Sequence, residues 1–220
     1  MLFKSLSIAA AAALALCAGA AQAATANGFA NGGFETAGVT TPAASWLTAA
    51  SGYSLSTDAR TGSFAAQLAS PAFSAAVMLQ NSIEQGGLPA LTEGDIPTLS
   101  FWAKGSAGGT GNVLFALRYL DGVGNIKANS GNRFFQGQIN ESGWTEITYS
   151  LGAVPVGATA AFIEFSQGIG PIEQGLPAGR VLIDDLRLSV TAAVPEPGTY
   201  ALLLAGLAVV GGMARRRRSA

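Results

Sequence analysis

Apolar and polar residues alternate along several short segments in the middle of the chain. The alternating apolar positions are Val113, Phe115, Leu117 and Tyr119 in Asn112–Leu120; Leu99, Phe101 and Ala103 in the segment before it; Ile147, Tyr149 and Leu151 in Trp144–Leu151; and Ala161, Ile163 and Phe165 in the next segment. A period of two residues is typical of strands with one buried face. Turn dipeptides and glycine clusters separate these segments, and no stretch between the two ends has sustained helical periodicity. The pattern therefore predicts an all-β sandwich.

The N-terminal segment Met1–Ala23 has the pattern of a secretory signal peptide. Lys4 precedes an apolar stretch from Leu6 to Ala18, and Ala21-Gln22-Ala23 provides a small-residue cleavage site. The apolar stretch is short and rich in alanine, which disfavours a first transmembrane helix. Cys17 is the one cysteine of the chain, so the mature protein has no cysteine and no disulfide. A lipoprotein signal, with its cysteine just after the cleavage point, is the remaining alternative.

The C-terminal segment Val194–Ala220 combines three physically different pieces. The stretch 194–198 contains two prolines and cannot continue a helix or a central strand, because proline lacks an N–H donor and restricts the residue before it. The run Tyr200–Ala214 carries no charge, and four arginines follow it. An apolar run stopped by arginines is typical of a membrane segment whose basic end stays in the cytoplasm. As a helix of about 22 Å it is short for a hydrocarbon core of about 30 Å, which suits a segment that is held briefly and then cut.

This order of Pro-Glu-Pro, hydrophobic stretch and arginine cluster resembles the PEP-CTERM sorting signal of Gram-negative bacteria. The matching residues are Pro195, Glu196 and Pro197 in the motif and Arg215, Arg216, Arg217 and Arg218 in the basic tail. The resemblance implies an exosortase, a membrane cysteine protease, that cleaves exported proteins near this motif, usually in systems that produce exopolysaccharide. It further implies export through the inner membrane, transient contact with that membrane, and a final place in the cell envelope or outside the cell. An ordinary C-terminal anchor behind a proline-rich linker is the alternative.

The composition changes its meaning once both ends are set aside. The whole chain of 220 residues is 49% hydrophobic, but much of that comes from the two ends. The stretch Ala24–Ala193 is long enough for one well-buried domain. In this stretch seven Lys and Arg face twelve Asp and Glu, a net charge of −5 without a basic run, which argues against a nucleic-acid partner. The predicted organisation is a signal peptide at 1–23, one domain at 24–193 and the sorting signal at 194–220, with a transmembrane helix at about 199–214.

Several segments of the predicted domain, in their order, resemble the galactose-binding-like jelly rolls, especially modules similar to carbohydrate-binding families. The segments are Asn31-Gly32-Gly33-Phe34-Glu35, Trp46, Arg60-Thr61-Gly62-Ser63-Phe64-Ala65, Leu99–Lys104, Gly143-Trp144 and Val181–Leu186. The likeness spans nearly the whole of the predicted domain. It implies a jelly-roll β-sandwich between the signal peptide and the short C-terminal helix.

Glu35 and Asp184 are the candidate metal ligands. Three leucines share the expected face of Asp184 in the last strand, Leu182, Leu186 and Leu188. A carboxylate on such a core-facing stripe is costly unless it is paired or bound to a cation. In the resembled modules a Glu of the opening segment and an Asp of the closing strand help to hold a structural calcium, and hard oxygen ligands suit Ca²⁺. The alternatives are a salt bridge to an arginine and an aspartate capped by backbone N–H groups.

Catalysis has little support in the sequence. The chain has no histidine, and with no cysteine after Ala23 this excludes Ser-His-Asp, Cys-His and His-ligated zinc chemistry. A glycosidase pair drawn from Glu141, Glu146, Glu164 and Asp185 stays formally open. Acidic residues that alternate on strand faces, as Glu146 and Glu164 do, ordinarily belong to a solvated face. The sequence therefore predicts a protein that is not an enzyme.

Trp46 and Tyr53 are the candidate sugar-stacking residues, because aromatic rings line most small-molecule sites. Trp102 and Trp144 lie in predicted strands, where aromatic residues more often belong to the core. The sequence thus predicts a non-catalytic protein of the cell surface or of the extracellular polysaccharide matrix, with exopolysaccharide as a candidate partner. The alternative is a carbohydrate-binding module with a defined glycan ligand, and a glycoside hydrolase has the least support.

Overall fold

The structure is a computed structural model. It describes residues 25–26, 28–70, 75–88, 91–109, 111–168, 178–191, 204–208 and 210. Ala23–Ala192 form one compact unit. The predicted signal peptide, the Pro-Glu-Pro motif and the arginine cluster lie outside the described residues. Among the residues that are described, no helix combines the length and the hydropathy needed to cross a membrane.

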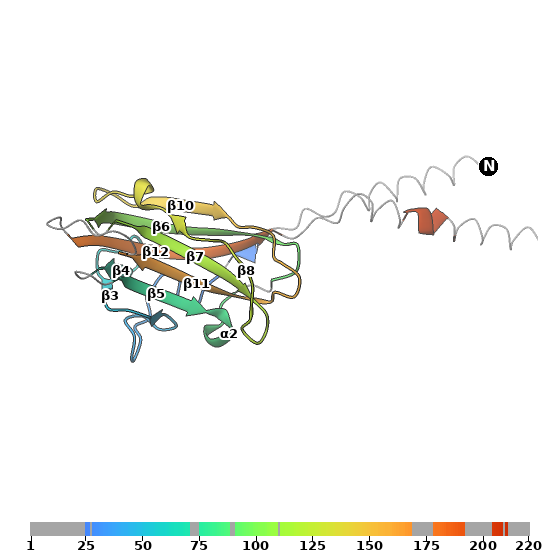
Figure 1. The fold of residues 1–220 in the computed structure, drawn as a ribbon, viewed down its shortest axis with the longest axis horizontal. Helices are drawn as coiled ribbons and strands as arrows, with labels where there is room; N and C mark the ends of the chain where they lie inside the picture. Colours follow the sequence, from blue (N-terminus) through green and yellow to red (C-terminus); the bar gives the residue numbers. More distant parts are fainter. Residues whose placement is uncertain are drawn as a thin grey trace, which may run out of the picture. The chain divides into compact units, whose positions relative to one another are not determined.

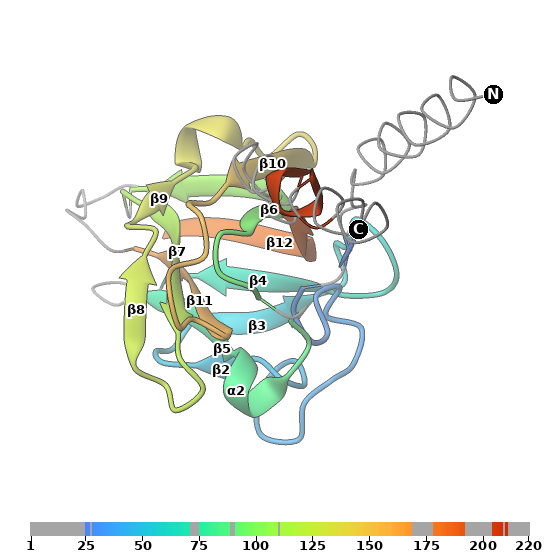
Figure 2. The same cartoon turned by 90° about the vertical axis from the view of Figure 1, so that its right-hand side faces the viewer.

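The compact unit consists of two antiparallel sheets, which Figures 1 and 2 show from two directions. The strands of the first sheet are β1 (Thr25–Ala26), β3 (Tyr53–Ser56), β4 (Ala65–Ala69), β6 (Ile96–Gly108), β10 (Thr145–Ser150) and β12 (Ala178–Thr191). Their order is β10-β6-β12-β4-β3, and β1 pairs with β12. The long strands β6 and β12 lie at the centre of this sheet.

The second sheet is built from the strands that lie, along the sequence, between those of the first sheet. They are β2 (Leu47–Thr48), β5 (Ala76–Asn81), β7 (Val113–Leu120), β8 (Ile126–Asn129), β9 (Arg133–Phe134) and β11 (Ala160–Gln167). Their order is β2-β5-β11-β7-β8, and β9 also pairs with β7. The helical turns α2 (Ser82–Gln85) and η1 (Gln136–Gln138) lie in connections between strands. The predicted all-β sandwich is therefore confirmed.

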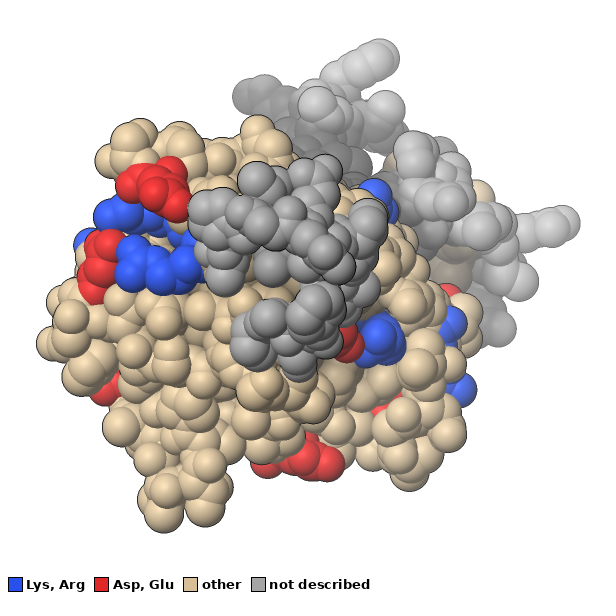
Figure 3. All heavy atoms as spheres, turned by 60° about the vertical axis from the view of Figure 1, so that its left-hand side comes forward, with Lys and Arg blue, Asp and Glu red and all other residues tan. Residues whose placement is uncertain are grey.

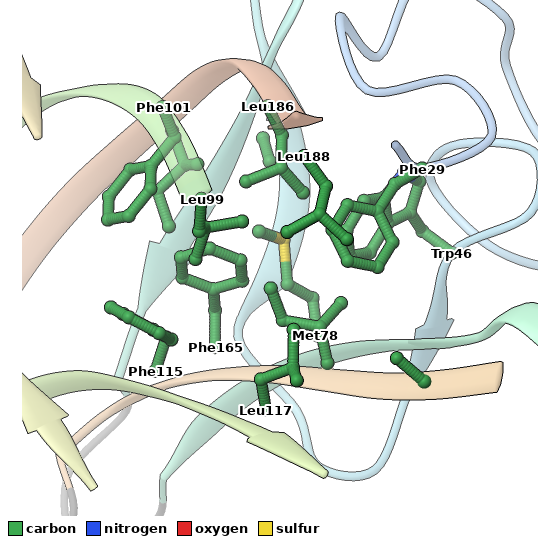
Figure 4. Packing of buried hydrophobic residues seen from close by; sticks show 14 of the residues in the cluster. Phe29, Trp46, Met78, Leu99, Phe101, Phe115, Leu117, Phe165, Leu186 and Leu188 are labelled. Atoms are coloured by element: carbon green, nitrogen blue, oxygen red, sulfur yellow. The ribbon is translucent and has the colours of Figure 1, made fainter. Parts of the chain in front are cut away.

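The core lies between the two sheets and uses the alternate residues that the sequence pattern predicts. At most 1% of the following side chains is exposed: Leu99, Phe101, Ala103, Phe115, Leu117, Ile147, Ala161, Ile163 and Phe165. Phe101 meets Phe165 edge to face with 5.0 Å between the ring centroids, and Phe115 at 5.9 Å. Figure 4 shows these rings together with the leucines of β6, β7 and β12. This edge-to-face packing joins the two sheets, because aromatic rings attract in that geometry.

Strand β12 changes its core-facing parity halfway along its length. Its core residues are Val181, Ile183, Leu186, Leu188 and Val190. The register against β6 shifts between Asp184 and Arg187, and Asp185 has a positive φ of 50°. This is a β-bulge, which adds one residue to one strand of a pair. The prediction that Asp184 shares a face with Leu186 and Leu188 is therefore wrong, and Asp184 lies on the outer face of the first sheet.

Candidate functional site

Glu35 and Asp184 hold one loop from its two ends. The clamped loop is Arg60-Thr61-Gly62-Ser63-Phe64, just before β4. Asp184 Oδ2 accepts the backbone N–H groups of the first two loop residues at 2.9 and 3.2 Å. The Glu35 carboxylate accepts those of the last two at 2.8 and 3.0 Å. A Cβ on Gly62, whose φ is +65°, would clash with the Glu35 carboxylate, which explains the glycine at the centre of the loop.

Asp184 is buried although it lies on an outer sheet face, with 0% of its surface exposed. Its second oxygen, Oδ1, accepts the N–H of Asp185 at 2.7 Å. Burial raises the pKa of Asp184 by desolvation, while the backbone N–H groups of Thr61, Asp185 and Arg60 act in the opposite direction. The carboxylate is thus a buried group whose partners are backbone donors.

The donor set around Glu35 and Asp184 fits carboxylates capped by N–H groups better than a calcium site. N–H donors point at both oxygens of each carboxylate. Calcium takes six to eight oxygen ligands. Within the described residues no group of three or more acidic, histidine or cysteine side chains is placed to hold a metal. The predicted calcium site at Glu35 and Asp184 stays a prediction, which a melting experiment tests.

Calcium is expected to leave the melting temperature of the domain unchanged, because backbone N–H groups already occupy the oxygens of both carboxylates. The measurement is a thermal melt of the metal-free protein in calcium and in EDTA. A bound ion at a hundredfold excess over its Kd would add about 2.7 kcal/mol to the free energy of unfolding, which a melt detects easily. A calcium-dependent rise that Asp184→Asn removes would instead confirm the calcium site.

The clamped loop also places a cation over a tryptophan of the first sheet. The guanidinium carbon of Arg60 lies 3.7 Å from the centroid of the Trp102 ring. Arg60 Nη1 lies 2.6 Å from Asp185 Oδ2, and Thr61 Oγ1 donates to Asp185 Oδ1 at 2.8 Å. A guanidinium within about 6 Å of an indole is attracted by the ring quadrupole. Trp102 therefore points away from the core and lies beneath Arg60. The alternation of the strand indicates this, because adjacent residues such as Phe101 and Trp102 point to opposite faces of a sheet.

The two predicted sugar-stacking residues are core residues. Trp46 is 0% exposed, packs against Phe29 and Phe34, and its indole N–H donates to the Asn31 carbonyl at 3.1 Å. Figure 4 shows Trp46 next to Phe29 at one side of the core. Tyr53 is 8% exposed, and burial raises the pKa of its phenol. A ring needs an open face to stack on a sugar, so these two predictions are wrong.

The outer face of the second sheet offers a different candidate surface. Its residues alternate with the core positions of β5, β7 and β11, and we call it the second-sheet face. They are Val77, Leu79, Leu114, Ala116, Arg118, Phe162, Glu164 and Ser166. Leu114 and Ala116 are only 2% exposed although they point away from the core. Val77 and Ser166 are also at most 8% exposed, so the part of this face that solvent reaches consists of the half-buried Leu79, Arg118, Phe162 and Glu164.

Arg118 is the centre of the polar group on the second-sheet face. Its Nη1 lies 3.3 Å from Glu164 Oε2, and its guanidinium carbon lies 5.1 Å from the centroid of the Phe162 ring, which is its cross-strand neighbour. Ser166 Oγ donates to the other Glu164 oxygen at 2.9 Å. The group presents N–H donors, carboxylate acceptors and an aromatic ring together. Such a set can bind sugar hydroxyls and an apolar sugar face at the same place.

The sequence pattern assigned Glu164 to a solvated face. It did not reveal that Arg118 of β7 is the partner of Glu164. Arg118 occupies the same parity on β7 as Glu164 on β11, but only the pairing register shows that the two strands are neighbours. The four carboxylates considered for a glycosidase pair do not gather at one site. Glu164 lies on the second sheet, Glu146 and Asp185 lie on the first, and Glu141 is in the exposed loop before β10.

The C-terminal end of the chain matches a known family model. Residues 193–218 match the PEP-CTERM protein-sorting motif. The resemblance of this end to PEP-CTERM signals is thereby confirmed. The motif implies export and an exosortase as processing partner, which leads to the cell envelope or the outside of the cell. No curated protein sequence matches the chain significantly.

Solved structures share the fold of the domain at low identity. The enzymatically active domain of tailspike protein 4 from bacteriophage CBA120 has a TM-score of 0.56 and 20% identity, over 74% of this chain and 21% of that chain. This chain thus spans about a fifth of the tailspike chain. The Stig cyclase Fisc from Fischerella sp. TAU, in complex with (3Z)-3-(1-methyl-2-pyrrolidinylidene)-3H-indole, has a TM-score of 0.52 and 17% identity, over 78% and 100%. The CBM22-1 xylan-binding domain of Paenibacillus barcinonensis Xyn10C has a TM-score of 0.48 and 12% identity, over 80% of this chain and 100% of that chain.

Proposed function

We propose that this protein is a non-catalytic component of the cell surface or of the extracellular polysaccharide matrix, and that it binds polysaccharide weakly through the second-sheet face. The PEP-CTERM motif at residues 193–218 supports export and exosortase processing. The observation that carries the binding part is the Arg118–Glu164 pair above Phe162 on an otherwise apolar face. In this proposal the folded domain serves the matrix, and the C-terminal signal delivers it there.

Charge favours a neutral polysaccharide over an acidic one. Seven cations against twelve anions give residues 24–193 a net charge of −5. Two cations of the first sheet share one carboxylate: Lys104 Nζ lies 2.9 Å and Arg180 Nη2 3.8 Å from the same oxygen of Asp58. Figure 3 shows one face of the molecule, where basic and acidic side chains lie next to each other in small groups. Among the described residues of that face, a polyanion would meet no extended basic patch.

The expected affinity is low, because the site is small and partly self-satisfied. A single stacked ring with a few hydrogen bonds gives a Kd of about 1 mM, or about −4 kcal/mol, once lost freedom is subtracted. Arg118 already binds Glu164 and covers Phe162, so a sugar must share or displace those contacts. Weak binding still holds a protein in a matrix when many copies meet a repeating polymer, because avidity multiplies it.

Neutral polysaccharide in a native gel is expected to retard the mature protein, and Arg118→Ala is expected to weaken that retardation by roughly tenfold or more. Loss of hydrogen bonds from a charged group costs about 1.5–3 kcal/mol, which sets this factor. Affinity electrophoresis at rising polysaccharide concentration measures the Kd. Arg187→Ala is the matched control, since Arg187 is an exposed arginine on the outer face of the first sheet.

The outcomes of this test separate the proposal from its alternatives. Equal retardation of Arg118→Ala and Arg187→Ala would contradict a site on the second-sheet face. Tight one-to-one binding to a single oligosaccharide would instead favour a carbohydrate-binding module with a defined ligand. Release of reducing sugar by the pure protein would overturn the non-catalytic role.

A further inference from the structure

Exposed aliphatic side chains concentrate at one end of the sandwich. We call this the aliphatic end, and its members are Ile83, Ile96, Val123, Ile126 and Val156, which are 42–84% exposed. They are five of the eight large exposed hydrophobic residues described in the compact unit, the others being Val39, Leu47 and Phe134. Single exposed aliphatic residues are normal, but a group of five on neighbouring segments marks an interaction surface.

Short contacts bring the segments of the aliphatic end together. A Cβ on Gly124 would lie 4.0 Å from Ile83 Cδ1, so the turn after β7 touches α2. A Cβ on Gly157 would lie 3.9 Å from Lys127 Cε, so the loop of Val156 touches β8. The loop 151–159 is also hydrogen-bonded to the start of β6, through Leu151 N–H to the Pro97 carbonyl at 2.8 Å. The five side chains therefore belong to one surface region.

The turn that carries Val123 is preorganised. Asp121 Oδ1 accepts the backbone N–H groups of Val123 and Asn125 at 3.1 and 2.9 Å, and Oδ2 accepts the Asn125 side chain at 3.0 Å. Lys127 Nζ lies 3.2 Å from the same carboxylate. The hydrogen bonds from Asn125 hold the pKa of Asp121 well below its usual range. A tip fixed in this way loses little conformational freedom when Val123 is inserted into a partner.

The chain leaves the domain at this same end. Thr191, the last residue of β12, pairs with Ile96, the first residue of β6. Only the short linker 192–199 separates Thr191 from the apolar run that begins at Tyr200. Even fully extended, this linker spans at most about 30 Å. Before processing, the aliphatic end therefore stays within about 30 Å of whatever surface holds that run.

We propose that the aliphatic end inserts its side chains into the lipid bilayer while the C-terminal signal is still attached, and that it releases the bilayer when the signal is removed. This rests on the proposed function and on the expectation from the sequence that the apolar run Tyr200–Ala214 is held in the membrane before exosortase processing. The tether supplies a high effective concentration of lipid, so even a weak apolar contact forms. Once the tail is cut, the contact alone is too weak to hold the domain.

The charges of the aliphatic end make this contact apolar rather than electrostatic. Within the described residues of its loops, 82–96, 121–127 and 151–159, the one cation is Lys127, which is paired with Asp121. Glu84 and Glu93 add negative charge to the same loops. The contact made by the aliphatic end itself, as distinct from that of Arg215–Arg218 in the tail, is therefore expected to be insensitive to salt and no stronger on anionic vesicles than on neutral ones. A polybasic surface would behave in the opposite way.

A single-cysteine label tests the proposal, since the chain has no cysteine after Cys17. The protein Ala24–Ala220 with Val123→Cys carries an environment-sensitive dye and is reconstituted into phosphatidylcholine vesicles. The emission is expected to rise roughly two- to threefold as the dye leaves water, and nitroxide-labelled lipid is expected to quench it. Ser106→Cys is the matched control on the same strand as Ile96, about 33 Å further along it. The labelled protein Ala24–Ala193 is expected to show no response.

Flotation of the vesicles distinguishes failure of membrane retention from failure of the bilayer contact. If Ala24–Ala220 floats with the vesicles but the label at position 123 behaves like the label at 106, the bilayer contact is overturned and membrane retention stands. If the protein does not float, both the retention step and the contact are overturned. A response of Ala24–Ala193 equal to that of the tethered protein would overturn release on processing. In the supported case, Ile126→Ser with Val156→Ser reduces the response at position 123.

Discussion

Replacing Pro195 and Pro197 by alanine is expected to keep the complete C-terminal tail on the exported protein. These prolines lie within the matched sorting motif, residues 193–218. Each proline removes an N–H donor and fixes φ, which disfavours a helix at these positions. With alanine in both places the helix of the apolar run can extend through the cleavage region. The intact mass of the exported protein measures the effect, since the wild-type product should end close to Pro195–Gly198.

The comparison needs cells with and without a cognate exosortase. Pro155→Ala is the matched control, because Pro155 lies in a loop of the folded domain and outside the sorting motif. It should be processed like the wild type. A wild-type product that still carries Arg215–Arg218 in exosortase-positive cells would contradict the assignment of this end as a processed signal.

Asp184→Ala is expected to lower the free energy of unfolding by about 3–5 kcal/mol, and the melting temperature by on the order of 10 °C. The substitution removes the acceptor of three backbone N–H groups, those of Arg60, Thr61 and Asp185. Buried donors without an acceptor keep their full desolvation cost. Urea or thermal unfolding of the mature domain measures the loss. Glu146→Ala is the control, since Glu146 is exposed on β10 and should change stability by about 0.5 kcal/mol or less.

The pH dependence of stability shows whether the contribution of Asp184 depends on its ionisable carboxyl group or only on the packing of its side chain. Because burial raises the pKa of Asp184 above 3.8 in the folded protein, the folded state binds the proton more tightly than the unfolded chain. The stabilising effect of protonation is complete below pH 3.8 and is lost as the pH rises through the folded pKa. Asp184→Asn should lack this contribution to the pH profile. Identical profiles for the wild type and Asp184→Asn would contradict the assignment.

The strands were predictable from the sequence because their signal is local. Phe115 and Ile163 sit in segments where apolar residues recur every second position, and both lie in the core. The same rule placed Phe101 inside, and its parity would also have placed Trp102 outside. The sorting signal was predictable for a similar reason, because its prolines, apolar run and arginines are consecutive in sequence.

The rest of the site depends on contacts between distant residues. Asp184 meets Arg60 across 124 positions, and no pattern near either residue reveals the pair. The bulge that turns Asp184 outward requires a positive φ at Asp185, a non-glycine residue. The buried Trp46 donates its indole N–H to the Asn31 carbonyl, a partner that only the tertiary structure reveals. Composition and periodicity contain no information of this kind.

Because β1 pairs with the end of β12, the removal of both terminal signals leaves the folded domain unchanged. Thr25 and Ala26 lie opposite Val190 and Ser189, so the first and last strands of the domain meet at their ends. The described core begins at Phe29 and ends at Val190. A cut after Ala23 and another near Pro195 therefore remove no core residue. The precursor and the processed product can therefore share one folded interior, because neither cut changes the described core.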